Sequence, residues 1–454
     1  MTPSNGSVDK ARLKRNLEKV TAILENTPAV DKTRMVEKAE FQDRARRVYA
    51  ALGTEGLECG LVFSDEHYCG DVPYLGGNTN ITVEQVAGVV GSTGFHIVAG
   101  LEGGYVAEQL SPRAGVKVHK AELLQLADEK YPVQAETLEE IIKDACGGRM
   151  PERIGLLTPR QVIPASLVEY CQAILGRDNV VDAQLLYYKI KYEKSDREMA
   201  LTHDAAVIGD AVMEALLAVL EPGLLETQVV AWGQFVAKEL GAEELGFDMM
   251  VGANTANRTL IGKALNRPIG PGDYVHLGVG TKRDGLNGCI RRSVVAVPSP
   301  QQVNDEQRYW FDLVEQAYRV GHETYCQVAR DNLPAKLQEQ ALVDFFAAHS
   351  EEVSQRCGRA VQLEQLKPYT GTHNSGYTEC QEFYGAITLE SQEPLGRQIV
   401  TMLDVALRGI GNYWDDIRLP GFDFLVVENT LGKFGTRVET FNRLPLNVQH
   451  LVGF

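Results

Sequence analysis

The segment from residue 194 to residue 223 reads KSDREMALTHDAAVIGDAVMEALLAVLEPG, which is the pattern of one long helix. Ser195 and Glu198 form a capping box, in which the hydroxyl accepts a backbone N–H and the carboxylate reaches back to the cap. A single apolar stripe at helical spacing follows, made of Met199, Ala206, Met213, Leu217 and Leu220. Pro222 and Gly223 end this helix, and residues 228–240 are predicted to form a second one.

The same arrangement returns about 110 residues later. A long helix is predicted over residues 304–330 and a shorter one over residues 338–349, with Pro334 between them. Strand-like segments follow each helix pair: residues 274–279 and 290–297 after the first, and residues 399–407 and 424–427 after the second. Two copies of a helix–helix–strand unit predict a pseudo-twofold domain with a cleft between its halves.

The chain before residue 188 has a different pattern. Residues 40–187 alternate predicted helices, at 41–52 and 138–145, with short apolar runs of buried-strand type, at 60–63, 86–90, 94–99 and 154–157. This alternation is typical of an α/β domain. Residues 1–39 are interpreted as a helical extension, which is either loosely attached or a docking arm for a second subunit. The expected class is therefore α/β (α+β), with parts at 1–39, 40–187 and 188–454.

Composition excludes several classes of partner. The chain has 45 Lys+Arg and 61 Asp+Glu, a formal net charge of −16. Nucleic acids and anionic membranes both require clustered basic residues, so we expect neither as a partner. The sequence lacks an apolar run of membrane-spanning length and the apolar segment of a signal peptide. Its eight cysteines form no C-x-x-C pair, which argues against a zinc ribbon or disulfide scaffold and favours the cytoplasm.

A series of short motifs follows a fixed order along the chain. They are Tyr74-Leu75-Gly76-Gly77, Lys194-Ser195-x-x-Glu198, Pro222-Gly223-x-x-Glu226, Gly252-x-Asn254, Gly272-Asp273-Tyr274-Val275, Arg292-Ser293 and His373-x-x-Gly376. In order and spacing they resemble the motifs of the creatinase, prolidase and aminopeptidase P family, whose fold is called pita-bread. The resemblance covers residues from about 40 to 454. It implies a creatinase-like N-terminal domain, a pita-bread catalytic-like domain, and a homodimer in which each cleft is completed by the partner.

The resemblance also implies where metal ligands would stand. The metallopeptidases of the family hold two divalent ions with two Asp, one His and two Glu, which activate a bridging water. The corresponding positions here are Gly278, Cys289, His373, Asp404 and Phe422. Only His373 is the expected ligand type, so we expect no two-metal centre and no cofactor. A single zinc on Cys289, His373 and Asp404 is an alternative with suitable donor types.

Creatinase is the family's example of catalysis without a metal, by a histidine on the loop before the first strand. That position is Thr259 here, beside Arg258, and the family's second pocket histidine corresponds to Cys380. Since strand side chains alternate between faces, Arg291 shares the face of Cys289, and His276 shares that of Gly278. A guanidinium at Arg291 can fill the space of the metals and face Asp404. It would then clamp an anionic substrate or form a structural ion pair; the remaining alternative is a solvated side chain.

The predicted catalytic residues are His373, as general acid or base, and Asp404, which would orient it. The alternative for His373 is a loop histidine bonded to the backbone. The predicted substrate-binding residues are Arg291, His276, Cys289, Cys380, Glu382 and Arg258. Each has a structural alternative: a core histidine for His276, inert thiols rather than nucleophiles for the cysteines, a surface acid for Glu382, and a solvated loop position for Arg258.

Three functions follow from these observations. The leading one is a metal-independent, creatinase-like hydrolase or lyase that acts on a C–N bond of a small anionic nitrogen-containing metabolite. The second is a non-catalytic binding module, because pita-bread domains without metal ligands occur in protein-interaction and histone-chaperone proteins. The third is an Xaa-Pro aminopeptidase or prolidase-type metallopeptidase. Fold alone does not decide between them.

Overall fold

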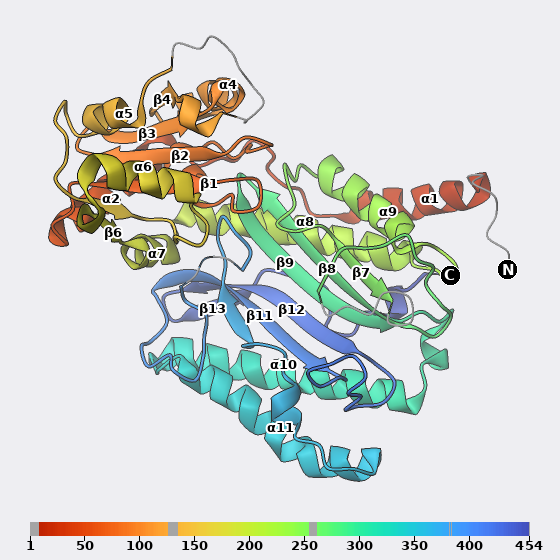
Figure 1. Ribbon diagram of the computed structural model, residues 1–454. Coiled ribbons are helices and arrows are strands. Elements are labelled where there is room, and N and C mark those ends of the chain that lie inside the picture. The colour runs from red at the N-terminus through yellow and green to blue at the C-terminus, as the bar shows by residue number, and fades with distance from the viewer. Residues whose placement is uncertain (1–8, 126–134, 254–260, 381, 383, 454) are drawn as a thin grey trace.

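The computed structural model describes residues 9–125, 135–253, 261–380, 382 and 384–453. The chain forms two parts, each built on its own sheet (Figure 1). The first has six strands in the order β4-β3-β2-β1-β5-β6, and the second has seven, with β10-β11-β12-β9-β8-β7 as its main path and β13 paired to β12. The predicted fold class is confirmed.

The N-terminal sheet is covered by helices on both faces. Its strands are β1 (Cys59–Ser64), β2 (Val86–Gly91), β3 (Gly94–Ala99), β4 (Lys117–Lys120), β5 (Ile154–Leu156) and β6 (Val180–Asp182). Its helices are α2 (Lys38–Thr54), α3 (Asp71–Gly76), α4 (Leu101–Leu110), α5 (Leu138–Ala145), α6 (Ala165–Leu175) and α7 (Gln184–Tyr192). Leu61 and Phe63 of β1 pack with α5 and α6, whereas Val62 between them packs with α2. Both faces of β1 are therefore buried, which explains its continuous apolar run. The predicted boundary at residue 187 falls inside α7.

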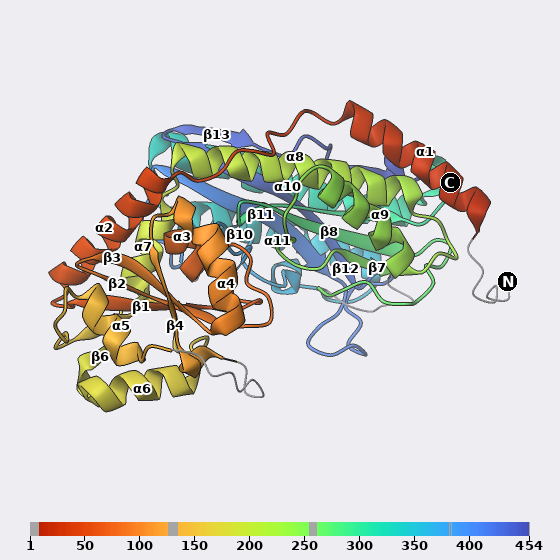
Figure 2. The same cartoon turned by 90° about the horizontal axis from the view of Figure 1, so that it is seen from above.

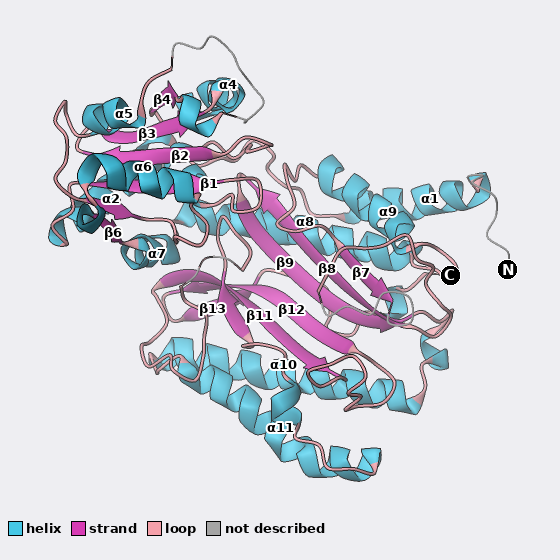
Figure 3. Cartoon of the chain, viewed as in Figure 1, coloured by secondary structure: helices cyan, strands magenta, loops and turns pink. Residues whose placement is uncertain are grey.

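The second sheet is built from two similar halves (Figure 3). The first half is α8 (Asp196–Val219), α9 (Glu226–Glu239), β7 (Met250–Ala253), β8 (Tyr274–Arg283) and β9 (Leu286–Val295). The second is α10 (Asp305–Asp331), α11 (Lys336–Cys357), β10 (Thr372–Asn374), β11 (Gln398–Arg408) and β12 (Phe424–Phe434), followed by β13 (Arg437–Thr440). The halves meet where β9 pairs with β12, so the strand order is mirrored about that pair. The predicted repeat of two helices followed by strands is thus present, with one strand more in each half, β7 and β10, than the two that were predicted.

The helix that opens the second sheet begins as predicted. The Ser195 N–H donates to Glu198 Oε2 at 2.8 Å, and the Glu198 N–H donates to Ser195 Oγ at 3.1 Å. Apolar side chains of α8 and α9 pack on β7–β9, and those of α10 and α11 pack on β11 and β12. The helices therefore cover one face of the sheet, and the opposite face carries Arg291, Asp404 and Glu428.

Helix α1 (Lys10–Asn26) is docked on the second part rather than loosely attached, and it lies near the C-terminal end of the chain (Figure 2). Val20 and Ile23 are buried in the same core cluster as α8, and Lys19 Nζ donates to the carbonyl of Ala218 at 2.9 Å. Leu17 on the same helix is 49% exposed. Among the described helices, none combines the length and apolar character that crossing a bilayer requires.

Docking of α1 predicts a difference between two substitutions on it. Ile23→Ala removes buried methyl groups and should lower the free energy of unfolding by about 2 kcal/mol, the lower end for such core truncations. Leu17→Ala is the matched control and should change it by less than about 0.5 kcal/mol. Urea denaturation of both variants measures this. Equal, small effects would show that α1 does not contribute to the folded core.

Candidate functional site

The strand register brings a row of polar residues together on the face away from the helices. Gly278 of β8 lies opposite Arg291 of β9, Arg291 lies opposite Glu428 of β12, and Glu428 lies opposite Asp404 of β11. Directly opposed residues of antiparallel strands point to the same face. His373 of β10 joins this face because its partner Met402 is two residues from Asp404.

Arg291 is the cation at the centre of this row. Its Nη1 lies 3.0 Å from Asp404 Oδ2 and 2.9 Å from the Tyr369 hydroxyl, and its Nε lies 3.9 Å from Glu428 Oε2. The guanidinium also stacks over Phe424, at 5.1 Å from the ring centre. Burial opposes its charge, but Tyr369, Asp404 and Glu428 outweigh burial and raise the pKa of Arg291 well above its usual value. The solvated alternative is wrong, because the side chain is buried and ion-paired.

His373 lies next to two carboxylates, neither of which is Asp404. Its Nε2 is 3.5 Å from Glu379 Oε1 and 3.7 Å from Glu428 Oε1, while its Nδ1 donates to the carbonyl of Asn374 at 3.1 Å. Burial opposes protonation, but Glu379, Glu428 and Asp404 together raise the pKa of His373 to about 10. At neutral pH the group is therefore an imidazolium, which can donate a proton. Asp404 does not orient it, because Asp404 is paired with Arg291.

Glu428 is the site residue that the sequence analysis missed. The family's last acidic position was placed at Phe422, which instead packs in the core against Trp310 and Tyr274. Glu428 is fully buried and contacts both Arg291 and His373. Burial, followed by the nearby charge of Asp404, raises the pKa of Glu428 to about 7. One signal in the sequence could have identified Glu428. It is the single acid that directly follows the apolar run from Phe424 to Val427, and the predicted strand ended at Val427.

The two cysteines of the predicted site differ. Cys289 is fully buried and its thiol donates to Glu428 Oε2 at 3.3 Å. Burial and the charge of Glu428 raise the pKa of Cys289 well above its usual value, so the thiol stays protonated and is a poor nucleophile. Cys380 is exposed and lines a cavity instead.

His276 does not extend the cluster. His276 packs edge-on against Phe424, with ring centres 5.6 Å apart, and burial followed by the charge of Arg291 lowers the pKa of His276 to about 3. It is thus a neutral core histidine between Phe424 and Gly252, where a Cβ would lie 2.3 Å from its ring. Arg258 lies outside the described residues.

A cavity of about 690 Å³ adjoins the cluster. Residues of the N-terminal domain, such as His67 and Ile81, line one side, and Phe247, Lys282 and Glu379 line the other. Its volume lies in the range of small-molecule sites. Glu379 belongs to both the cavity and the cluster, so it marks the point at which a bound molecule approaches His373.

The donor set does not fit the family's two-metal centre. The ligand atoms of His373, Asp404 and Glu428 lie within 4.8 Å of one another, as do those of Cys289, Glu379 and Glu428. However, Arg291 already supplies a cation to Asp404 and Glu428, which are the carboxylates that a metal pair would share. At Gly278, where the resemblance places the family's first Asp, the chain offers no carboxylate, and a Cβ there would lie 3.0 Å from Met250 Sδ and 3.4 Å from Arg291 Cγ.

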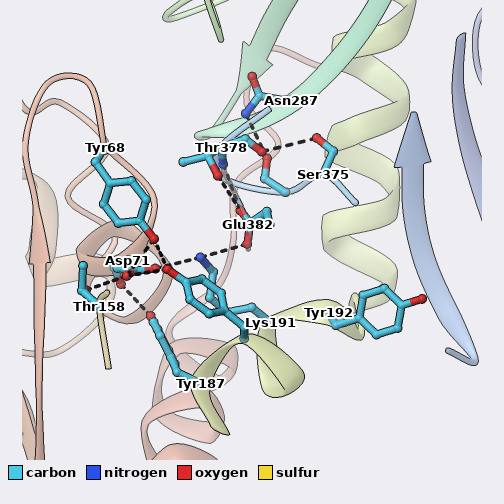
Figure 4. A network of polar contacts seen from close by, with 12 residues as sticks. Tyr68, Asp71, Thr158, Tyr187, Lys191, Tyr192, Asn287, Ser375, Thr378 and Glu382 are labelled. Carbon is cyan, nitrogen blue, oxygen red and sulfur yellow. Dashed lines mark hydrogen bonds and ion pairs between the residues drawn. The ribbon is translucent and has the colours of Figure 1, made fainter. Parts of the chain in front are cut away.

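Glu382 belongs to a second buried network, at the junction of the two domains (Figure 4). Lys191 Nζ lies 3.0 Å from Glu382 Oε2 and 2.9 Å from Asp71 Oδ1, and the Thr378 N–H donates to Glu382 Oε1 at 3.0 Å. All three charged side chains are at most 3% exposed. The interpretation of Glu382 as a surface acid is wrong, and the residue lies outside the set that lines the cavity. It ties the loop that follows His373 to the N-terminal domain.

Removing the central cation of this network should be strongly destabilising. Lys191→Met leaves Asp71 buried without its ion-pair partner and leaves Glu382 with Lys194 as its neighbouring cation, so we expect a loss of about 3–5 kcal/mol in the free energy of unfolding. Lys189→Met is the matched control, because Lys189 is exposed on the same helix, and it should be nearly neutral. Thermal and urea denaturation measure both. A stable Lys191→Met variant would contradict the importance of this ion pair.

The raised pKa of His373 predicts how stability depends on pH. An unfolded histidine has a pKa of about 6.5, so the folded state, with a pKa of about 10, binds the proton more tightly. This contribution is complete below about pH 6.5 and is lost as pH rises toward 10. The stability difference between wild type and His373→Gln should therefore shrink between pH 7 and pH 10. His349→Gln, on α11, is the control and should show no such trend. A constant difference would mean that His373 is neutral.

Comparisons with known proteins agree with this fold. A model of metallopeptidase family M24 matches residues 200–375. The uncharacterized peptidase YqhT of Bacillus subtilis is 24% identical over 282 residues, which are 62% of this chain and 71% of that protein. The prolidase from Pyrococcus horikoshii OT3 superposes with a TM-score of 0.67 at 15% identity, over 89% of this chain and 99% of that one. The N-terminal domain of FACT complex subunit SPT16 from chickpea gives 0.65 at 10% identity, over 94% and 100%. The resemblance to the creatinase, prolidase and aminopeptidase P family is thereby confirmed: residues 200–375 are similar to metallopeptidase family M24, and the chain has the pita-bread fold.

Proposed function

We propose that this protein is a creatinase-like hydrolase that cleaves a C–N bond of a small anionic nitrogen-containing compound without the two-metal centre of its relatives. The observation that carries the proposal is the Arg291 guanidinium, buried against Asp404 and near Glu428. In this position a permanent organic cation balances the charge that two metal ions would otherwise balance. The broader part of this proposal, that the protein is a hydrolase of the M24 type, is supported by the family model and by the peptidase relative.

The proposed reaction uses His373 and Glu428 as a pair. Glu428, whose pKa is about 7, takes a proton from the attacking water, while the imidazolium of His373 gives a proton to the leaving nitrogen. Water adds to the carbon, the C–N bond breaks, and the amine leaves with the proton from His373. The two side chains lie 3.7 Å apart, so the proton gained by Glu428 can return to His373 and restore both groups.

The cavity supports a small zwitterionic or anionic substrate. Lys263 and Lys282 line it, paired with Asp248 at 2.7 Å and with Glu244 at 3.1 Å, so a substrate carboxylate would replace one of these acids. Glu379 offers a negative charge next to His373 for a nitrogen group. Arg291 balances the charge of the carboxylates in the site and does not bind the substrate, because its guanidinium already forms an ion pair with Asp404. This changes the role that the sequence suggested for Arg291.

Two other functions have an observation in their favour. A prolidase-like metallopeptidase is favoured by the grouping of His373, Asp404 and Glu428 within 4.8 Å. A non-catalytic binding module is favoured by the burial of the Arg291–Asp404 pair, which satisfies the charges without any ligand. A homodimer and a cytoplasmic location also remain proposals, resting on the family resemblance and on the unpaired cysteine pattern.

Activity measured on chelator-treated protein tests the proposal. Guanidino acids, betaines, cyclic imino acids and dipeptides are first screened for a rise in melting temperature, and release of the amine product is then measured for those that bind. We expect turnover to persist after chelation. His373→Gln and Glu428→Gln should each lower kcat by about 100-fold or more, as for the loss of a general acid or base.

The control is His349→Gln, which removes a histidine of α11 outside the site and should leave kcat unchanged. Turnover of dipeptides only after addition of Mn²⁺, Co²⁺ or Zn²⁺ would instead establish the metallopeptidase. Ligand binding without turnover of any compound, unchanged in His373→Gln and Glu428→Gln, would establish the binding module.

A further inference from the structure

Two buried histidines, His96 and His119, face each other in the N-terminal sheet. Neither belongs to the cluster around Arg291. His96 lies on β3, His119 on the neighbouring parallel strand β4, and Asp144 on α5, which packs over these strands. His96 Nδ1 is 2.9 Å from His119 Nε2, and Asp144 Oδ2 lies 3.6 Å and 3.8 Å from these two atoms. The histidines are 2% and 6% exposed, whereas the Asp144 side chain is 39% exposed and connects the cluster to solvent.

The outer ring nitrogens are held by neighbours that fix where the protons are. His119 Nδ1 lies 2.7 Å from Glu136 Oε2, and an ionised carboxylate only accepts, so this nitrogen carries the hydrogen. His96 Nε2 lies 2.8 Å from the Thr93 hydroxyl, and the same hydroxyl lies 3.1 Å from the carbonyls of Asp144 and Ala145, which can only accept. When the single hydrogen of Thr93 is donated to a carbonyl, Thr93 accepts from His96, and His96 Nε2 carries the hydrogen.

With these donors, two lone pairs point at each other. In a neutral histidine only one ring nitrogen carries a hydrogen, so His96 Nδ1 and His119 Nε2 are then both acceptors, 2.9 Å apart. Such a contact is repulsive unless a positive charge lies between the two atoms.

We propose that His96 Nδ1, His119 Nε2 and a carboxylate oxygen of Asp144 bind one divalent transition-metal ion, with zinc as the probe ion. Imidazole nitrogens and a carboxylate suit zinc and its neighbours, with water as a fourth ligand. Zinc–nitrogen bonds of about 2.0–2.1 Å at a tetrahedral angle place two nitrogens about 3.3 Å apart, so the rings need to separate by only a few tenths of an ångström.

The surroundings have the features of a metal site. Histidine ligands of metals donate their other N–H to a carboxylate, carbonyl or similar acceptor, which fixes the ring orientation, as Glu136 and Thr93 do here. Lys117 lies 2.7 Å from Asp144 and competes for this carboxylate, but the pair is exposed and therefore weak. The ion would cross-link β3, β4 and α5, so its role is to stabilise the N-terminal domain, independently of the reaction proposed above.

Zinc titration of the chelator-treated full-length protein tests this site. Calorimetry should give one equivalent of zinc, and zinc should raise the melting temperature. His96→Gln/His119→Gln should abolish both effects, while Glu428→Gln, which alters the cleft of the second domain, should retain both. Absence of zinc binding by wild type, or zinc binding that survives in His96→Gln/His119→Gln and disappears in Glu428→Gln, would overturn the proposal.

A milder variant keeps the test valid if the double histidine variant does not fold. Asp144→Asn changes a half-exposed ligand and should weaken zinc binding at least tenfold, and Glu136→Gln should weaken it about 10- to 100-fold through His119. Lys117→Ala is the matched control on the same cluster and should bind zinc at least as tightly as wild type. Unchanged zinc affinity in both Asp144→Asn and Glu136→Gln would overturn the proposal.

Discussion

Buried negative charge in the second domain requires a fixed positive charge, and Arg291 supplies it. Asp404 and Glu428 lie opposite each other on adjacent central strands, away from water. Two unpaired carboxylates in such a place would protonate or destabilise the sheet. In the metallopeptidases of this family, divalent ions serve this purpose. Here the guanidinium is a covalent part of β9, so the charge balance does not depend on the supply of an ion.

The consequence for chemistry is a separation of roles within one cluster. Asp404 is held by Arg291, and this leaves Glu428 and Glu379 as the carboxylates nearest to His373. Their combined charge raises the pKa of His373 and keeps it protonated. Burial raises the pKa of Glu428 to about 7, so this carboxylate can gain or lose a proton near neutral pH. Two titratable groups in contact, with pKa values shifted apart, are the arrangement on which the proposed acid–base chemistry rests.

A second buried ion network connects this site to the N-terminal domain. Lys191 bridges Asp71 of that domain and Glu382, which closes the loop that begins at His373 (Figure 4). Asn287, at the start of β9, donates to the carbonyl of Gly376 in the same loop. The loop is therefore fixed at both ends by buried polar contacts. The cavity beside it is bounded by both domains, so the shape of the substrate site depends on this junction.

Local signals in the sequence were sufficient for the elements and for part of the site. The capping box at Ser195 depends on residues three apart, and the shared face of Cys289 and Arg291 depends only on strand alternation, so both were readable. Pairings between distant strands were not. Glu428 faces Arg291 only because β9 and β12 join the two halves, and Glu382 finds Lys191 only at the domain junction. The chain's own order thus determined which elements form and which face each side chain takes. Tertiary structure alone decided which charges meet, because burial and opposition across a sheet are set by partners far away along the chain.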